Sequence, residues 1–240
     1  MIHPELAKVR EPMVALPRVK SILAALALAF ASASRADDPP PDARELLRSV
    51  RIAQSAQNWK LAGHIRIGSR KTPFRLTLEN GAIRYQFTDN GDTITLRLGE
   101  KSSTIEETKG GKTERITAAK FGAPVHGTDI SYEDLALRFL YWPDARVAGT
   151  DMISARRCWK VEARPASAND SQYARVMLWI GREDGALMRA ECYDAAGKVA
   201  RRFTVTSFMK REGLWLLKQM RIEHSNTRSQ TYLEIEDVEK

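Results

Sequence analysis

Three apolar and aromatic runs, joined by very short links, constrain what this chain can fold into. The runs span residues 173–180, 186–193 and 199–208, and Gly185 and Gly197 lie in the two links. Val, Ile, Phe, Tyr and Trp favour strands, and glycine adopts the positive φ that tight turns need. Links this short join antiparallel strands, because a parallel crossover needs a dozen or more residues. The segment therefore predicts an antiparallel meander.

The first half of the chain repeats this pattern in a cleaner form. Between residues 74 and 98, apolar and polar residues alternate in three short runs. Asn80-Gly81 and Asn90-Gly91-Asp92 separate these runs and are strong hairpin signals. Such alternation indicates strands with one buried and one solvated face. Weaker polar strands are expected at 103–108 and 112–118, and further strands follow from residue 146 onward.

Two helices interrupt the strand pattern. Asp42 is expected to be the N-cap of a helix over residues 43–57, because an apolar stripe at helical spacing follows it. A second helix is predicted over residues 131–141. Ser131 is its expected N-cap, and Asp134 stands three positions later, as in a capping box.

Together these elements predict a mainly β (α+β) fold in one domain, residues 42–240. A single antiparallel sheet of about 11–12 strands must curl or close, and its apolar faces then point inward. The two helices are available to cover the open concave side. Since two short helices leave part of the interior unfilled, we expect a large curved sheet, or incomplete β-barrel, with a residual apolar cavity.

The beginning of the chain has the pattern of a secretory signal peptide. Basic residues precede an apolar run at 22–30, and small residues follow it. We expect a signal at residues 1–33, cleaved after Ala33 or Ala36, and a proline-rich linker at 34–41. Met13 is an alternative start. The apolar run is shorter than the ~20 residues that span a membrane, so an exported protein is predicted rather than an anchored one.

The net charge limits the classes of binding partner, and the positions of the cysteines indicate whether they form a disulfide. The formal net charge is +8, and the basic residues are spread over the chain. With an export signal, this spread argues against nucleic acid, although it suits a transient contact with an anionic membrane surface. Cys158 and Cys192 are expected on strands that flank a third strand. They would then lie nearly ~10 Å apart, beyond the reach of a disulfide, so two buried free thiols are predicted.

No motif for catalysis, metal or cofactor binding is found. The chain has no G-x-S-x-G, no P-loop and no G-x-G-x-x-G pattern. His64, His126 and His224 are scattered without the spacing of metal ligands. No catalytic residue, metal or cofactor is therefore predicted.

Three further features have a simpler interpretation than a functional site. Gly110-Gly111, flanked by lysines, is interpreted as a hairpin turn rather than a phosphate cradle. The acidic pair Glu106-Glu107 is interpreted as part of a solvated sheet edge. The pair Glu133-Asp134 is explained by its position at a helix start, where negative charge is favourable.

An ordered set of short motifs in the second half carries a resemblance. The motifs are Ser131-Tyr132-Glu133-Asp134-Leu135, Gly149, Cys158-Trp159 before Pro165, Tyr173-x-x-Val176-x-x-Trp179-Ile180, Tyr193-Asp194-x-x-Gly197-Lys198, Gly213-x-Trp215 and Thr231. Together they resemble the outer-membrane lipoprotein-sorting protein family, whose fold is like that of the periplasmic lipoprotein carrier LolA. The resemblance covers residues 125–238. Leu217 departs from it, since a proline is expected there.

The resemblance implies an unclosed barrel with a helical lid, in the periplasm of a Gram-negative cell. It also implies a hydrophobic ligand, the acyl chains of a lipoprotein or lipid, and it supplies no catalytic residues. The first hypothesis is thus a non-catalytic, monomeric carrier or chaperone for acylated cargo in lipoprotein sorting. One alternative is a periplasmic sensor or adaptor that docks a receptor protein of the inner or outer membrane. The other is an enzyme that acts on lipid.

Under the first hypothesis, the apolar side chains of the alternating strands line the cavity and the second helix forms its lid. The expected lining residues are Phe74, Leu76, Leu78, Ile83, Tyr85, Phe87, Ile94, Leu96, Leu98 and Phe139. The expected lid residues are Tyr132, Leu135 and Leu140.

Overall fold

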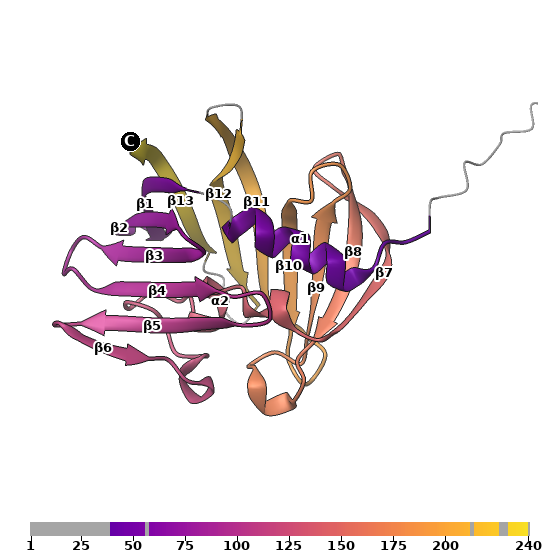
Figure 1. Ribbon diagram of the computed structural model, residues 1–240, viewed down its shortest axis with the longest axis horizontal. Helices are drawn as coiled ribbons and strands as arrows, with labels where there is room; N and C mark the ends of the chain where they lie inside the picture. Colours follow the sequence, from indigo (N-terminus) through magenta and orange to yellow (C-terminus); the bar gives the residue numbers. More distant parts are fainter. Residues whose placement is uncertain (1–38, 56–57, 212–213, 226–229, 240) are drawn as a thin grey trace, which may run out of the picture. The chain divides into compact units, whose positions relative to one another are not determined.

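One antiparallel sheet organises the residues that this computed structural model describes, which are 39–55, 58–211, 214–225 and 230–239. The sheet has 13 strands in the order β6-β5-β4-β3-β2-β1-β13-β12-β11-β10-β9-β8-β7 (Figure 1). Every strand thus pairs with a neighbour in sequence, and β1 pairs with β13. Within the described residues, the edge strands β6 and β7 do not pair with each other. The prediction of a large, incompletely closed sheet is confirmed.

The strands follow the alternating patterns of the sequence. Their bounds are β1 (Trp59–Ile67), β2 (Arg70–Glu79), β3 (Ala82–Phe87), β4 (Thr93–Leu98), β5 (Ser103–Lys109), β6 (Lys112–Arg115), β7 (Asp144–Ile153), β8 (Arg156–Arg164), β9 (Arg175–Gly181), β10 (Leu187–Tyr193), β11 (Val199–Arg211), β12 (Leu214–His224) and β13 (Gln230–Glu239).

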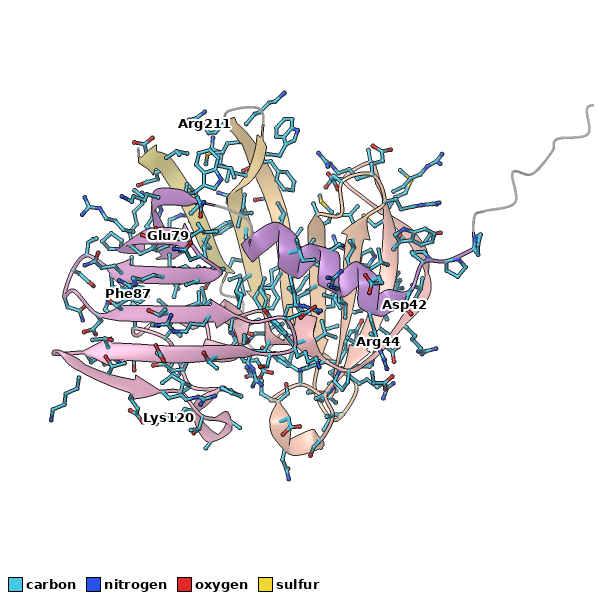
Figure 2. All side chains as sticks on the ribbon, viewed as in Figure 1. Asp42, Arg44, Glu79, Phe87, Lys120 and Arg211 are labelled. Carbon is cyan, nitrogen blue, oxygen red and sulfur yellow. The ribbon has the colours of Figure 1, made fainter. Side chains whose placement is uncertain are left out.

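Helix α1 (Ala43–Ser55) lies over the open side of the sheet, as predicted (Figure 1). Asp42 is its N-cap, since Asp42 Oδ1 accepts the backbone N–H groups of Arg44 at 2.8 Å and Glu45 at 3.1 Å. Figure 2 shows Asp42 and Arg44 together at this end of the helix. Leu47 and Val50 are buried in the core beneath it.

The helix predicted over residues 131–141 is wrong as a single element. The structure has a short helix α2 (Tyr132–Leu135) and a 3₁₀-helix η2 (Arg138–Tyr141), with Leu137 between them at φ 44°. A left-handed residue ends a right-handed helix, so the chain turns there. The capping box at its start is complete. Ser131 Oγ accepts the Asp134 N–H at 3.2 Å, and the Ser131 N–H donates to Asp134 Oδ2 at 3.0 Å.

The remaining elements are short 3₁₀-helices and the tight turns that join the strands. Two more 3₁₀-helices are η1 (Ala118–Lys120) and η3 (Ala168–Asp170). Asn80 and Gly81 have φ of 51° and 72° and join β2 to β3, as the tight hairpin requires. Gly110 and Gly111 join β5 to β6 with φ of 53° and 80°, so this pair is a hairpin turn.

Both cysteines are free and buried, as predicted. Cys158 lies on β8 and Cys192 on β10, with β9 between them. Cys192 belongs to the main core, whereas Cys158 packs with Trp179 and Met188 in a small cluster on the other face of the sheet. Burial raises the pKa of both thiols.

The predicted signal peptide and its cleavage positions lie outside the described residues. Residues 34–38 of the predicted linker also lie outside them. Among the residues that the structure describes, no helix is long and apolar enough to cross a membrane.

Candidate hydrophobic-ligand site

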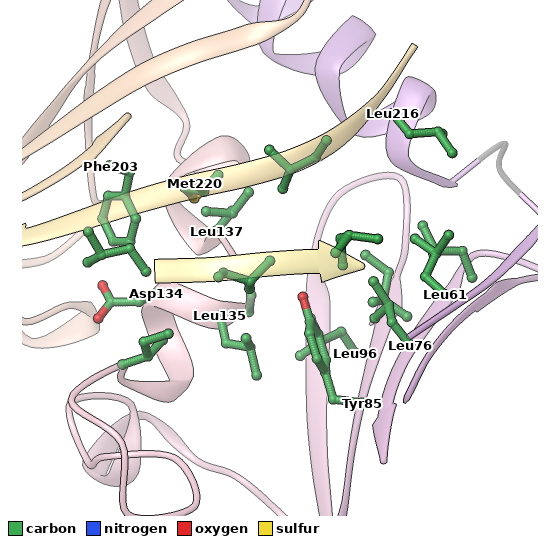
Figure 3. Close-up of a pocket in the computed structure, with 18 of the residues that line it drawn as sticks. Leu61, Leu76, Tyr85, Leu96, Asp134, Leu135, Leu137, Phe203, Leu216 and Met220 are labelled. Carbon is green, nitrogen blue, oxygen red and sulfur yellow. The ribbon is translucent and has the colours of Figure 1, made fainter. Parts of the chain in front are cut away.

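An apolar cavity of about 210 Å³ lies between the sheet and residues 130–141, which we call the lid segment (Figure 3). The lid segment contributes Ile130, Asp134, Leu135, Ala136 and Leu137 to the wall. Strands β1–β4 and β11–β13 contribute the rest, which are Leu61, Leu76, Leu78, Ile83, Tyr85, Leu96, Leu98, Phe203, Trp215, Leu216, Leu217, Met220, Ile222, Leu233 and Ile235. The wall is thus almost entirely aliphatic and aromatic.

The structure brings together six of the ten residues predicted to line a cavity. They are Leu76, Leu78, Ile83, Tyr85, Leu96 and Leu98. Each comes from β2, β3 or β4, and the strict alternation of these strands points all six to one face.

The other four predicted residues lie outside this wall, since they are packed into the core. They are Phe74, Phe87, Ile94 and Phe139. Phe87 stacks on His126 with ring centroids 4.0 Å apart, and Phe139 packs against Phe203 with centroids 6.3 Å apart. Period-two alternation identifies the buried face of a strand, but it does not show which part of that face another ring covers.

Of the three predicted lid residues, Leu135 lies in the cavity wall. Tyr132 and Leu140 are buried in the core and lie outside the wall. Tyr132 and Leu135 are three positions apart in α2, whereas Leu140 lies in η2, beyond the left-handed Leu137.

Sequence reasoning missed the part of the wall that β11–β13 provide. Phe203, Leu216, Met220 and Leu233 line the cavity from these strands. Two register shifts in the β11–β12 pairing interrupt the regular alternation of these two strands. The pairing of β1 with β13, which brings these strands to the others, joins opposite ends of the described chain. Strong apolar content in residues 214–222 was the available signal.

Asp134 is the charged residue in the wall, and its carboxylate is fully engaged. The residue is 2% exposed. The Tyr173 hydroxyl donates to Oδ1 at 2.6 Å, and Arg201 Nη1 lies 2.5 Å from Oδ2. We call Asp134, Tyr173 and Arg201 the latch, because they fasten the lid segment to the sheet. Burial, with the Asp134 charge beside it, raises the pKa of Tyr173.

Further polar contacts reinforce the latch from the loop before the lid segment. Arg201 Nη1 also donates to the carbonyl oxygen of Asp129 at 2.7 Å. Thr231 Oγ1 donates to the Asp129 carboxylate at 2.6 Å, and His224 Nε2 lies 3.3 Å from the same group. The lid segment is therefore held by β11, β12 and β13 together.

Glu133 is buried beside the latch, so a position at a helix start does not fully explain the acidic pair. Glu133 Oε2 accepts the Gln172 N–H at 3.1 Å, and Oε1 has no hydrogen-bond partner among the described residues. Desolvation raises the pKa of this carboxyl. The solvated interpretation of Glu107 is also wrong. This side chain is buried, and it pairs with Lys109 at 2.8 Å.

The cavity opens at one end of the sheet. Ile83, Leu98 and Leu217 are partly exposed wall residues, and Trp215 is 61% exposed. Ile83 is the second residue of β3 and Leu98 ends β4, so the strand register places both at the same end. Figure 3 shows Asp134 at one end of the cavity and Leu61 and Leu216 at the other. The polar latch thus closes one end, and apolar side chains surround the mouth.

No group of His, Cys, Asp and Glu that could hold a metal ion is found in the described part of the chain. His126 bonds Asp89 at 2.9 Å, and His64 lies between Glu234 and Glu236 at 3.1 Å and 3.0 Å. Each of these two histidines is thus paired with carboxylates on a neighbouring strand or loop. None of them lines the cavity.

Several solved structures share this fold. One is an outer membrane lipoprotein-sorting protein domain from Vibrio parahaemolyticus. The superposition covers 82% of this chain and 91% of the Vibrio chain, with a TM-score of 0.67 and 16% sequence identity. A LolA superfamily protein from Nitrosomonas europaea matches 83% of this chain and 94% of its own, with a TM-score of 0.61 and 14% identity. A third is a DUF1329 family protein from Desulfovibrio piger. The superposition covers 81% of this chain and 90% of the Desulfovibrio chain, with a TM-score of 0.61 and 18% sequence identity. At these identities, the likeness establishes the fold.

No curated protein matches the chain. Residues 108–240 match a family model that is described as an uncharacterized protein. Because the matched residues make up more than half of the chain, it belongs to this family of uncharacterized proteins, with the fold of the LolA superfamily.

Proposed function

We propose that the protein is a non-catalytic periplasmic carrier for acylated cargo, either a lipoprotein or a lipid. The observation that carries the proposal is the apolar cavity between the lid segment and the sheet. The likeness to a lipoprotein-sorting domain supports the same class of cargo. The proposed location in the periplasm rests on the predicted signal peptide and on the resemblance of the sequence to that family.

The size of the cavity fits part of one acyl chain. An apolar cavity of about 150 Å³ is large enough for benzene, so one of about 210 Å³ takes a somewhat longer apolar group. Each buried methylene contributes ~0.8 kcal/mol, and about eight of them contribute ~6 kcal/mol. Binding of this strength is reversible, as a carrier needs. A cargo with several chains requires displacement of the lid segment.

The cavity wall offers no free acid or base for catalysis. Asp134 and Tyr85 are the ionisable residues in the wall as far as the structure describes it. Both oxygens of Asp134 are occupied by the latch and by Ser131. Burial raises the pKa of Tyr85, so its hydroxyl stays protonated. These features support a binding role.

Transient contact with a membrane is part of the proposal. Trp215 lies in the cavity wall and also borders a groove with Met152 and Arg157, in which Arg156 is paired with Asp184. Met152 is 60% exposed and Trp215 is 61% exposed. Tryptophan favours the membrane interface, and arginine favours anionic head groups. This surface would bring the mouth of the cavity close to a bilayer.

The test fills the cavity without changing its polarity. Ala136 lies in the wall, is 5% exposed and has a right-handed backbone conformation. We expect Ala136→Phe to occupy the cavity and to weaken binding of decan-1-ol at least about tenfold. Calorimetric titration of protein purified from the periplasm measures the affinity. Native mass spectrometry of the same protein shows whether an acyl lipid co-purifies.

The control is Ala119→Phe, which makes the same enlargement at an exposed position on η1, outside the cavity. This variant should bind decan-1-ol as the unmodified protein does. Equal binding by Ala136→Phe and Ala119→Phe, with both variants folded, would show that the cavity is not the acyl site. Absence of any decan-1-ol binding would reject the proposed function.

A further inference from the structure

A second hollow of about 240 Å³ lies next to the apolar cavity. It is bordered by Arg48, Arg51 and Ile52 of α1, by Leu98, Gly99 and Glu100 at the end of β4, and by Tyr141 of η2. Leu98 belongs to the walls of both hollows. The second hollow, which we call the arginine pocket, therefore lies beside the mouth of the cavity.

Arg51 brings a positive charge to the arginine pocket without a carboxylate partner. Its Nη1 donates to the carbonyl oxygen of Leu140, and its guanidinium lies 5.0 Å from the centre of the Tyr141 ring. Among the described residues, no carboxylate forms an ion pair with Arg51. Partial burial is the main reason that the pKa of Arg51 is lowered. A bound anion would restore part of the solvation that this guanidinium has lost.

Tyr141 and Arg48 complete the polar lining. The Tyr141 hydroxyl is shielded from water and has no hydrogen-bond partner among the described residues. Arg48 approaches Glu45 at 3.6 Å and Glu100 at 3.9 Å, and Glu100 is 77% exposed. Surface pairs of this length contribute little, so a bound anion can replace Glu100. The pocket thus offers two guanidinium groups and one hydroxyl.

We propose that the arginine pocket binds the anionic head group, a carboxylate or a phosphate, of a single-chain acyl lipid whose tail lies in the apolar cavity. Guanidinium groups recognise both kinds of anion through paired hydrogen bonds. The common border at Leu98 lets one molecule reach both hollows. This inference rests on the proposed function and adds the class of ligand.

The test compares three ligands with the same ten-carbon tail. Decanoate and decyl phosphate are anionic, whereas decan-1-ol is neutral. We expect calorimetric titration to show that both anions bind at least about tenfold more tightly than decan-1-ol, as one or two charge-assisted hydrogen bonds would provide. Arg51→Met should reduce this preference to less than about threefold.

Two further variants separate a local site from a general charge effect. Arg48→Gln changes an exposed side chain of the pocket and should also reduce the preference for anions. Lys101→Gln removes the same charge one residue beyond Glu100, outside the pocket, and should leave the preference intact. Because Arg48 is exposed, its variant remains informative if Arg51→Met fails to fold.

The outcomes distinguish this inference from the proposed function. Equal affinity for all three ligands would overturn the head-group site and leave the carrier proposal standing. Equal effects of Arg48→Gln and Lys101→Gln would also overturn the site. If inorganic phosphate binds as tightly as decyl phosphate, the pocket is a free-anion site and the inference is wrong. If no ligand with a ten-carbon tail binds, both proposals fail.

Discussion

At the scale of single residues, the burial of Glu133 is the most consequential feature that the sequence did not predict. A helix start explains an acidic residue, yet this one is fully buried beside the latch. Burial depends on which strands cover the helix, and no local pattern encodes that. The same holds for Asp134, whose partners Tyr173 and Arg201 lie on the segments around β9 and β11.

The raised pKa of Glu133 gives a prediction with a defined sign. Desolvation is its main cause, so the folded chain binds this proton more tightly than the unfolded chain does. Stability therefore falls as pH rises from about 4.3, the ordinary value, to the folded pKa, and the loss persists above it. Glu133→Gln, which keeps an acceptor for the Gln172 N–H, should be about 1 kcal/mol more stable than the unmodified protein at pH 8.

Urea unfolding at pH 4 and pH 8 measures this effect. The advantage of Glu133→Gln should shrink at pH 4, where the glutamic acid is itself protonated. Glu100→Gln, at an exposed position, is the control and should show no such dependence. A Glu133→Gln variant that is less stable at pH 8 than at pH 4, relative to the unmodified protein, would contradict the assignment.

At the scale of elements, Gly63 allows β1 and β13 to approach closely where their pairing is irregular. The β1–β13 register shifts between Ala62 and Gly63, so Glu236 of β13 has no partner on β1. A Cβ atom at Gly63 would lie 2.2 Å from the backbone oxygen of Glu234. Since a backbone atom cannot move aside cheaply, Gly63→Ala should lower the free energy of unfolding by about 2–3 kcal/mol.

The matched control is Gly122→Ala. Its added Cβ would be 3.6 Å from the side chain of Gln172, which is ordinary contact. Urea unfolding of this variant should agree with the unmodified protein within about 0.5 kcal/mol. Similar stability of Gly63→Ala and Gly122→Ala would show that the backbone of Glu234 does not lie this close to Gly63.

Elements were predictable from the sequence where one local rule determines them. Alternation and Asn-Gly turns predicted β2, β3 and β4, and Asp42 predicted the start of α1. The lid segment was predicted as one helix because its residues favour a helix throughout. The left-handed Leu137, which divides it, carries no local signal, since leucine rarely adopts this conformation. Leu135, before the break, lies in the cavity wall, whereas Phe139, after it, is buried in the core.

At the scale of the whole described unit, residues 39–239, the open sheet determines what the protein can do. A sheet of this width was predictable from the number of strands, whereas the wall from β11–β13 depends on the distant pairing of β1 with β13. The open edges are protected. Strand β6 is only four residues long with every residue exposed, and β7 is irregular near Gly149. A short, exposed edge and an irregular one oppose pairing between copies, which agrees with the monomer expected from the sequence.

The exposed apolar side chains at the mouth provide the prediction at this scale. The centre of the Trp215 ring lies 5.8 Å from Lys210 Nζ, and Arg157 borders the same groove, so an inserted indole would bring these cations to the head groups. We expect protein purified from the periplasm to float with phosphatidylglycerol vesicles and not with phosphatidylcholine vesicles. Burial of one tryptophan is worth roughly 1.5–3 kcal/mol, so Trp215→Ala should weaken this binding about tenfold or more.

Because Trp215 is 61% exposed, its replacement should change the free energy of unfolding by less than about 0.5 kcal/mol. Trp215→Phe is the matched variant, since it keeps an aromatic ring and should retain most of the vesicle binding. Trp215→Ala should weaken binding of decan-1-ol in solution less than it weakens vesicle binding, because Trp215 is the most exposed residue named in the cavity wall. Flotation of Trp215→Ala equal to that of the unmodified protein would mean that another surface faces the membrane, and the route from bilayer to cavity would have to begin elsewhere.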